Sequence, residues 1–373
     1  MKNRIAICAL IALIICLIPG IFRLGQQYRE NKASERKLAE AAANYFASSR
    51  AAETALYSGI VYHIFFHSLI AYPELAAKDV RNAALYRDHM ITRDEFKKIL
   101  FSLYQNGYAL IDISSIYQVE TDGRVTRKQL YMPKGKKPLI ISLDDLNYYG
   151  FMKGHGFADK LVLDADERVA TEIVAPDGKM LVTRDGDVVP IIDDFVRDHP
   201  DFSVNGAKGI IAVTGFEGIL GYRTQPDEKQ LPSHRLKELF GAKPVVEELK
   251  RTGWKFASHS YSHDHSFQID TISLDAVKAD TEKWQREVGS IVGKTDIFIG
   301  PFGQIFQPGD PRREYLVSQG FHMLAGVGMD HYLRYFSDHA VIDRTDIDGY
   351  RLRNNALQLK GYFDTASVLV PAL

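Results

Sequence analysis

Apolar and polar positions between residues 60 and 350 form a pattern that predicts repeated strand–helix units. Short runs such as LIIS at 139–142 are apolar on both faces, as buried parallel strands are. Other segments carry apolar residues at helical spacing, and before one of them Thr92 and Glu95 form a predicted capping box. We therefore expect an α/β fold with a parallel sheet covered by helices, either open or closed into a barrel.

A different pattern interrupts the strand–helix units between about residues 147 and 187. Polar and apolar residues alternate there with the period of a strand, and Asp-Gly pairs stand at 177–178 and 185–186. Asp-Gly between alternating runs is a strong hairpin signal. This part of the chain is therefore predicted to be a hairpin-rich insertion.

The N-terminal segment has the pattern of a membrane span. Two basic residues precede an almost unbroken apolar run at 5–22, which is about 27 Å long as a helix. The run exceeds the core of a cleaved signal peptide and ends without a small-x-small site. We expect residues 1–23 to be an uncleaved signal anchor, a single-pass transmembrane helix in the cell membrane. Residues 24–58 predict a polar juxtamembrane helical stalk, and residues 59–373 form the main domain.

Composition excludes some kinds of partner and site. The chain is 46% hydrophobic and 25% charged, and its formal net charge of -1 gives no reason to expect nucleic acid as a partner. The two cysteines, Cys8 and Cys16, both lie in the N-terminal apolar run. The main domain therefore has neither a disulfide nor a cysteine metal site.

Two adjacent carboxylates, Asp144 and Asp145, directly follow a predicted buried strand. Burial of such a pair is costly unless it binds a cation or accepts strong hydrogen bonds. Neighbouring strand residues point to opposite sides, so one carboxylate can bind a metal while the other acts on water. The alternative is a turn or a helix N-cap, where Asp is common.

The stretch HSYSHDH at 259–265 follows another predicted strand and contains three of the 12 histidines. His259 and His263 are four residues apart, so a single helical turn would put both imidazoles on one face. Two imidazoles with a carboxylate form a common open site for a divalent metal. The alternative is a polar exposed loop, and His265, outside this spacing, is expected to face solvent.

A third cluster, IGPFG at 299–303, ends a later predicted strand. Its Pro and Gly residues could aim a backbone N–H at a developing oxyanion, but on its own the cluster is typical of an ordinary strand-to-loop turn. In order and setting, SLDD, HSYSH and IGPFG resemble the T-F-D-D, H-S/T-x-x-H and R-x-P-Y-G motifs of the polysaccharide deacetylases of carbohydrate esterase family 4, the chitooligosaccharide-deacetylase homology family. The flanking segments FFHSLI, ITRDEFKKILFSLYQNGYALIDISSI and REYLVSQGFHMLAGV are also similar. The resemblance covers roughly residues 60–350, with longer segments at about 147–187 and 216–232.

The resemblance implies a distorted or incomplete (β/α) barrel with Asp145, His259 and His263 as metal ligands. Asp144 would be the general base, and Phe302 would offer its backbone N–H to the oxyanion. Zinc is the first choice of metal, with cobalt, manganese or nickel as alternatives, because this ligand set accepts several divalent ions. The implied reaction is hydrolysis of N-acetyl or O-acetyl groups on an amino-sugar polymer, such as peptidoglycan or another envelope glycan, outside the cytoplasm.

The sequence departs from the family pattern at the arginine that pairs with the catalytic aspartate. Ile299 stands at that position. Asp144 would therefore need a partner from another strand, and Arg344 or Arg351 could approach it. We take Arg344 as the candidate catalytic residue.

The family's late general-acid histidine has no clear counterpart, and His331 and His339 are candidates by position alone. A second hypothesis is therefore a catalytically degenerate, glycan-binding module on the same fold. A third keeps the metal site but acts on another amide, such as a peptide. Several aromatic residues near the motifs could stack on sugar rings: Tyr148, Tyr149, Phe151, Tyr222, Tyr261 and Phe267.

Overall fold

The computed structural model describes residues 53–227 and 231–370. The chain divides into two compact units between Ala52 and Glu53, and all the described residues belong to the second unit. The predicted signal anchor and most of the predicted stalk therefore lie outside the described residues. Among the residues that are described, no helix is long and apolar enough to span a bilayer.

The described domain begins earlier than the pattern of the sequence suggested. Strand β1 (Thr54–Leu56) lies within the last residues of the predicted stalk and pairs antiparallel with β6 (Tyr131–Pro133). A strand pair supplies the backbone hydrogen bonds that a polar helix would otherwise make internally. Residues 54–56 thus form part of the folded domain.

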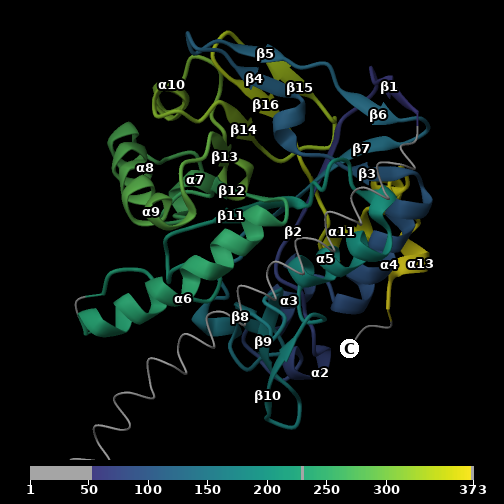
Figure 1. Ribbon diagram of the computed structural model, residues 1–373. Helices are drawn as coiled ribbons and strands as arrows, with labels where there is room; N and C mark the ends of the chain where they lie inside the picture. The colour runs from purple at the N-terminus through teal and green to yellow at the C-terminus, as the bar shows by residue number, and fades with distance from the viewer. Residues whose placement is uncertain (1–52, 228–230, 371–373) are drawn as a thin grey trace, which may run out of the picture. The chain divides into compact units, whose positions relative to one another are not determined.

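A 10-stranded sheet lies at the centre of the domain (Figure 1). Its order is β15 (Leu333–Tyr335), β16 (Ala340–Ile342), β14 (Met323–Ala325), β13 (Ile297–Ile299), β12 (Trp254–Ser258), β11 (Gly209–Val213), β7 (Lys137–Leu143), β2 (Tyr62–Phe66) and β17 (Thr345–Asp346), with β3 (Tyr108–Leu110) also paired to β7. Strand β15 is antiparallel to β16, and the other pairings described in this sheet are parallel. The predicted α/β class with a parallel-rich sheet is confirmed.

One continuous segment brings the two ends of this strand order together. Strand β16 pairs with β14, with Val341 opposite Leu324. Strand β17 follows directly in the chain and pairs with β2, with Thr345 opposite Ile64. The parallel strands therefore form a ring, and their carboxyl ends share one edge of it.

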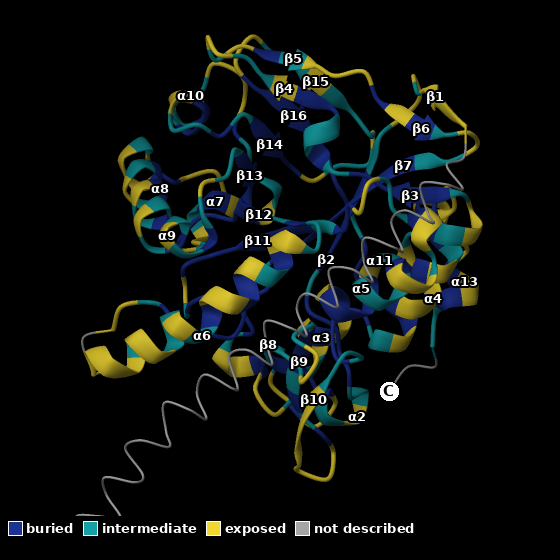
Figure 2. Cartoon of the chain, viewed as in Figure 1, coloured by how far each residue is buried: buried dark blue, intermediate teal, exposed yellow. Residues whose placement is uncertain are grey.

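Alternate residues of the ring strands belong to two different cores. Outward-facing side chains such as Ile64, Phe66 and Ile141 pack with the surrounding helices. The other face contributes a second core: Ile140, Ile210, Ala212, Ala257, Ile297, Ile299, Met323, Ala325, Ala340 and Ile342. Figure 2 shows the central strands as buried, while the helices around them have exposed outer faces. This double burial explains the continuous apolar runs in the sequence.

In the described part of the chain, helices lie between the strands, and three more follow the last strand. They are α2 (Pro73–Ala76), α3 (Ala83–His89), α4 (Arg93–Gln105), α5 (Val188–Asp198), α6 (Pro232–Arg251), α7 (His265–Gln268), α8 (Leu274–Glu287), α9 (Gly289–Val292), α10 (Pro311–Ser318), α11 (Gly349–Asn354), α12 (Ala356–Leu359) and α13 (Thr365–Val368). The predicted capping box is confirmed at α4, where the Thr92 side chain accepts from the Glu95 N–H and the Glu95 carboxylate accepts from the Thr92 N–H.

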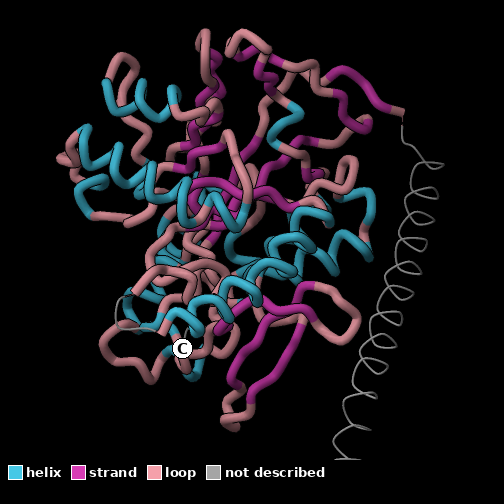
Figure 3. The backbone as a smooth tube through the Cα atoms, turned by 60° about the vertical axis from the view of Figure 1, so that its left-hand side comes forward, coloured by secondary structure: helices cyan, strands magenta, loops and turns pink. Residues whose placement is uncertain are grey.

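The predicted hairpin-rich insertion is a separate antiparallel sheet. Its strands are β8 (Ala158–Leu163), β9 (Val169–Val174) and β10 (Met180–Thr183), with β9 in the middle. Figures 1 and 3 show this sheet to one side of the ring. A further antiparallel pair, β4 (Tyr117–Val119) with β5 (Val125–Arg127), adds side chains to the inner core of the ring.

Candidate metal and catalytic site

Asp144 and Asp145 lie at the carboxyl end of β7, where the chain leaves the ring. Asp144 is buried, and its N–H donates to the carbonyl of Phe66 on the neighbouring strand. Asp145 adopts a left-handed backbone with φ 55°. Its Oδ1 accepts a 2.6 Å hydrogen bond from the Tyr149 hydroxyl. The two carboxylates therefore have different partners.

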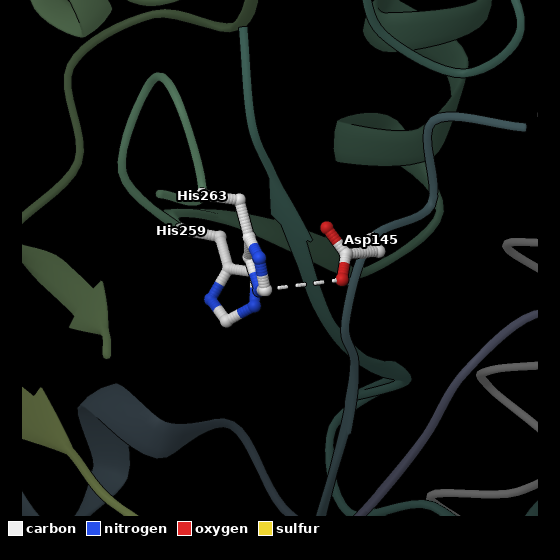
Figure 4. A group of neighbouring side chains, drawn as sticks. All are labelled: Asp145, His259 and His263. Carbon is white, nitrogen blue, oxygen red and sulfur yellow. Dashed lines mark ion pairs between the residues drawn. The ribbon is translucent and has the colours of Figure 1, made fainter. Parts of the chain in front are cut away.

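His259 and His263 approach Asp145 from the loop after β12 (Figure 4). The predicted single helical turn is wrong, because this segment is a loop with left-handed residues at Ser260 (φ 60°) and His263 (φ 49°). Asp280 on α8 holds the loop by accepting from the N–H groups of Tyr261 and Ser262. Side-chain hydrogen bonds thus replace helical ones, yet the two imidazoles still come together, with ring centroids 4.9 Å apart.

One ligand atom each of Asp145, His259 and His263 lies within 4.8 Å of the other two. The His263 Nε2 is 3.5 Å from Asp145 Oδ2. Burial lowers the pKa of His259, which favours its neutral form. Burial would raise the pKa of Asp145, but the charges of His263 and His259 outweigh it and hold that pKa below its usual range. Neutral imidazole and carboxylate are the forms that bind a metal.

A second contact orients the His259 ring. Its Nδ1 lies 2.8 Å from the carbonyl oxygen of Ile299, at the end of β13. A carbonyl can only accept, so Nδ1 carries the proton and the Nε2 lone pair remains for a metal. This arrangement, with a backbone carbonyl behind a ligating histidine, is usual at metal sites. The residues present therefore fit a divalent metal.

Arg344 forms a bidentate ion pair with Asp144. Its Nη1 and Nη2 donate to Oδ1 and Oδ2 at 2.7 and 3.0 Å. Burial would raise the pKa of Asp144, but the charges of Arg344 and His259 outweigh it and hold that pKa well below its ordinary value. Asp144 is therefore a carboxylate at neutral pH, as a proton acceptor must be.

Other contacts fix the Arg344 guanidinium in place. Nε donates to the carbonyl of Gly326, and Nη1 also donates to the Ser142 hydroxyl at 3.1 Å. The guanidinium carbon lies 4.2 Å from the centroid of the Phe65 ring. Arg344 lies between β16 and β17, in the segment that joins the two ends of the strand order. The partner that Ile299 cannot provide thus comes from a later segment of the chain.

The other arginine that the sequence offered has different contacts. Arg351 lies on α11, and its Nη1 lies 3.2 Å from the Met329 sulfur. Ile299 itself is buried in the inner core and contributes its carbonyl oxygen to His259. Of the two predicted candidates, Arg344 is therefore the one that pairs with Asp144.

Phe302 lies beside the histidines, as its place in the motif predicted. Its ring centroid is 4.3 Å from that of His263, and its backbone is left-handed with φ 54°. Gly303, which follows, donates its N–H to the carbonyl of Gly300 and closes a tight turn. The Phe302 backbone is therefore held next to the metal-ligand group.

His67 is a residue of this site that the sequence analysis did not single out. It follows β2 on the same alternating face as Phe65, and its ring lies 5.9 Å from the Phe65 ring. Its charge is among the influences that lower the pKa of both Asp144 and Asp145. Its Nδ1 is buried without a hydrogen-bond partner in the described part of the chain. The alternation of His63, Phe65 and His67 was the signal that could have identified it.

The histidines proposed by position have other surroundings. His339 precedes β16, stacks on Phe336 and lies 2.6 Å from a guanidinium nitrogen of Arg313. His331 packs against the rings of Tyr62 and Tyr362. His265 begins α7, with its ring centroid 6.3 Å from that of Phe302.

Comparison with known proteins gives similarities to solved structures. No family model matches the chain, and no curated protein matches it. The Streptococcus pyogenes deacetylase PplD in complex with acetate is 13% identical, with a TM-score of 0.42, and the match covers 79% of this chain and 94% of that one. IcaB from Ammonifex degensii is 13% identical, with a TM-score of 0.43 and coverage of 84% and 98%.

A third similar structure carries a family description. BA3943 from Bacillus anthracis, a CE4 family pseudoenzyme, is 13% identical with a TM-score of 0.25, and the match covers 46% of this chain and 54% of that one. Because these identities and TM-scores are low, residue roles are inferred from the contacts within this chain. The motifs of the chain resemble those of the polysaccharide deacetylases of carbohydrate esterase family 4, and one of these similar structures is described as a member of that family.

Proposed function

We propose that this chain is a metal-dependent deacetylase that removes N-acetyl groups, or O-acetyl groups, from an amino-sugar polymer. The observation that carries the proposal is the convergence of Asp145, His259 and His263 within 4.8 Å, directly beside the Asp144–Arg344 pair. A metal-ligand set next to a charged, oriented carboxylate is the arrangement that hydrolysis of an acyl group requires.

Asp145, His259 and His263 would hold the metal. Zinc is our first choice, with cobalt, manganese and nickel as alternatives. A divalent ion at this position lowers the pKa of water and polarises an acyl carbonyl. The Ile299 carbonyl and the Tyr149 hydroxyl would orient two of the ligands through the hydrogen bonds described above.

Asp144 would act as the general base that takes a proton from the attacking water. Its neighbour His259 has Nε2 3.8 Å from Asp144 Oδ2, so the carboxylate adjoins the ligand set. Arg344 would keep Asp144 ionised and fix its orientation through two parallel hydrogen bonds. This role needs the planar guanidinium group of an arginine, which can donate two parallel hydrogen bonds to one carboxylate.

The amine that leaves the acetyl group needs a proton, and His67 is our candidate donor. Its charge acts on both carboxylates, and it directly follows β2, whereas Asp144 directly follows β7. Phe302 would offer its backbone N–H to the oxygen on which negative charge develops. An Asp base and a His acid at the ends of neighbouring strands would give the two proton transfers to two different side chains.

The test is acetate release by the full-length chain from acetylated chitooligosaccharides and from peptidoglycan. We expect release that depends on added Zn²⁺, Co²⁺ or Mn²⁺ and that is lost in Asp144→Asn and in His259→Ala. An absence of release on both glycans with a stoichiometric bound metal would overturn the enzymatic proposal for these substrates.

The second candidate is a glycan-binding module without turnover. It was suggested by Ile299 at the position of the family's arginine, and that argument weakens because Arg344 pairs with Asp144 instead. Binding of glycan and metal without acetate release would favour this candidate. Release of acetate from an acetylated peptide but not from glycans would favour a different amide substrate.

We also propose a location and a domain arrangement. Residues 1–23 would be a signal anchor, the residues from 24 to the start of β1 a stalk, and the residues from β1 to 373 the catalytic domain. The catalytic domain would lie outside the cytoplasm, where an acetylated envelope polymer is found. The ring of parallel strands would be the distorted (β/α) barrel that the resemblance implies, with residues 147–187 as its insertion.

A further inference from the structure

Exposed aromatic rings surround the proposed metal ligands. Of the aromatic residues that the sequence offered for sugar stacking, four are buried in the core: Tyr148, Tyr222, Tyr261 and Phe267. Phe151 is 43% exposed, and two phenylalanines that the sequence did not suggest, Phe216 and Phe302, are 47% and 44% exposed. The structure thus replaces the predicted set with a smaller one at the surface.

Tyr149 joins two of these rings to the site. Its centroid lies 6.0 Å from that of Phe151, with the rings nearly parallel at 15°, and 5.9 Å from that of Phe216. Its hydroxyl donates to Asp145, a proposed metal ligand, and lies 3.1 Å from the Thr214 hydroxyl. The row Phe151–Tyr149–Phe216 is therefore continuous with the metal-ligand group.

A hydrogen bond joins the two loops that carry these aromatic residues. The N–H of Gly150 donates to the Glu217 carboxylate at 2.6 Å, which ties the loop after β7 to the loop after β11. Phe151 also stacks on the buried ring of Tyr86, at 6.1 Å and 9°. These loops open the two segments that are longer than the family pattern. Their aromatic side chains are thus fixed before any ligand arrives, which reduces the entropy lost on binding.

Apolar side chains scattered singly over a surface need no explanation, but a connected row beside a site does. The exposed rings of Phe151 and Phe216 have no hydrogen-bonding groups, so a partner must offer them an apolar face. The C–H face of a pyranose ring has this character, and its hydroxyl groups remain in water. Phe302, 4.3 Å from His263, adds another exposed ring at the proposed ligands.

We propose that Tyr149, Phe151 and Phe216 form a subsite that stacks against a sugar next to the one that is deacetylated. This inference rests on the proposed function and names its substrate class more narrowly, as an extended glycan chain. Oligosaccharides of two or more sugars reach this subsite and a single sugar does not, so the row sets a preference for oligomers over the monosaccharide.

The test uses the full-length protein and the double variant Phe151→Ala/Phe216→Ala. The control is Phe101→Ala, because Phe101 is equally exposed at 47% but lies on α4. Kinetics of acetate release are compared on a long N-acetylglucosamine oligomer and on the monosaccharide N-acetylglucosamine. For the double variant we expect KM for the long oligomer to rise roughly 10-fold with kcat unchanged, as for the loss of aromatic contacts. Kinetics on the monosaccharide, and of the control on both substrates, should stay the same.

A binding measurement keeps this proposal separate from the proposed function. Affinity for the long oligomer is measured by calorimetry in the Asp144→Asn background, with and without the two Phe→Ala changes. A roughly 10-fold loss of affinity in the triple variant supports the subsite even if the wild-type chain releases no acetate. Equal affinities, or equal KM values in the kinetic assay, would overturn it. The single variant Phe216→Ala should lie between the two, which guards against a folding defect in the double variant.

Discussion

The guanidinium of Arg344 donates two hydrogen bonds, of 2.7 and 3.0 Å, to the carboxylate of Asp144, although the residues are 200 positions apart in the chain. Both side chains are buried, with Arg344 wholly inaccessible to solvent. A buried ion pair of this kind is costly to break from one side, because the remaining charge has no partner. The pair therefore links the stability of the domain to the orientation of the proposed base.

Replacement of Arg344 by methionine should leave the Asp144 carboxylate buried and unpaired. We expect the free energy of unfolding to fall by about 3–5 kcal/mol and acetate release to be lost. Urea denaturation measures the first effect. The double variant Asp144→Asn/Arg344→Met should be more stable than Arg344→Met alone, because no charge is left behind. Arg124 is an exposed arginine and serves as the control. If Arg344→Met lowers the free energy of unfolding no more than Arg124→Met does, this account is contradicted.

Two variants should distinguish the residues that bind the metal from the residue that acts as the base. His259→Ala removes a proposed ligand and should lose both the bound metal and acetate release. Asp144→Asn leaves the three ligands intact and should keep the metal while losing release. Metal content by mass spectrometry and acetate release are measured on the same samples, before and after treatment with a chelator. Loss of metal in Asp144→Asn would assign Asp144 to the ligand set instead.

His67→Gln should reveal whether this imidazole donates a proton to the leaving group. We expect kcat on an N-acetyl substrate to fall by about 10²–10⁴-fold, the usual contribution of a general acid. On 4-nitrophenyl acetate the fall should be much smaller, because a nitrophenolate leaves without a proton. His265→Gln, at the start of α7, serves as the control and should change neither rate. Equal losses on both substrates would point to a structural role for His67.

Asp187 should make the stability of the fold depend on pH. This residue caps α5, and its Oδ1 accepts from the N–H groups of Leu69 and Val188 at 3.0 and 2.7 Å. Burial raises the pKa of Asp187 to about 6, although its hydrogen bonds oppose the rise. The folded state thus binds this proton more tightly than the unfolded state. The stabilisation that protonated Asp187 adds to the free energy of unfolding is fully present below the ordinary carboxyl pKa near 4. It is lost as pH rises through about 6.

The variant Asp187→Asn should remove that dependence. Between about pH 4 and pH 7, we expect the Asp187 side chain to lower the free energy of unfolding of the wild-type chain by on the order of 3 kcal/mol. The variant should not show this decrease. Urea denaturation of both proteins across this range gives the comparison. Parallel stability profiles for the two proteins would show that Asp187 does not carry a raised pKa.

The sequence alone determined the features that depend on neighbours along the chain. The capping box of Thr92 and Glu95, the buried strand before Asp144 and the hairpins of the insertion follow from local periodicity and turn chemistry. Because parallel strands end at one edge, the motifs after β7 and β12 could also be expected to meet. The resemblance of these motifs to those of the deacetylase family then named Asp145, His259 and His263 as one set, and their side chains do converge.

Tertiary structure decided which distant side chains complete the site. Arg344 meets Asp144 because one segment pairs first with β14 and then with β2, a closure that no local pattern specifies. The imidazoles converge through a loop held by Asp280, where sequence spacing suggested a helical turn. His67 joins the site because it directly follows β2, with its ring 5.9 Å from that of Phe65. Periodicity gives the face of a strand, whereas the partner across that face is set by the closure and packing of the whole ring.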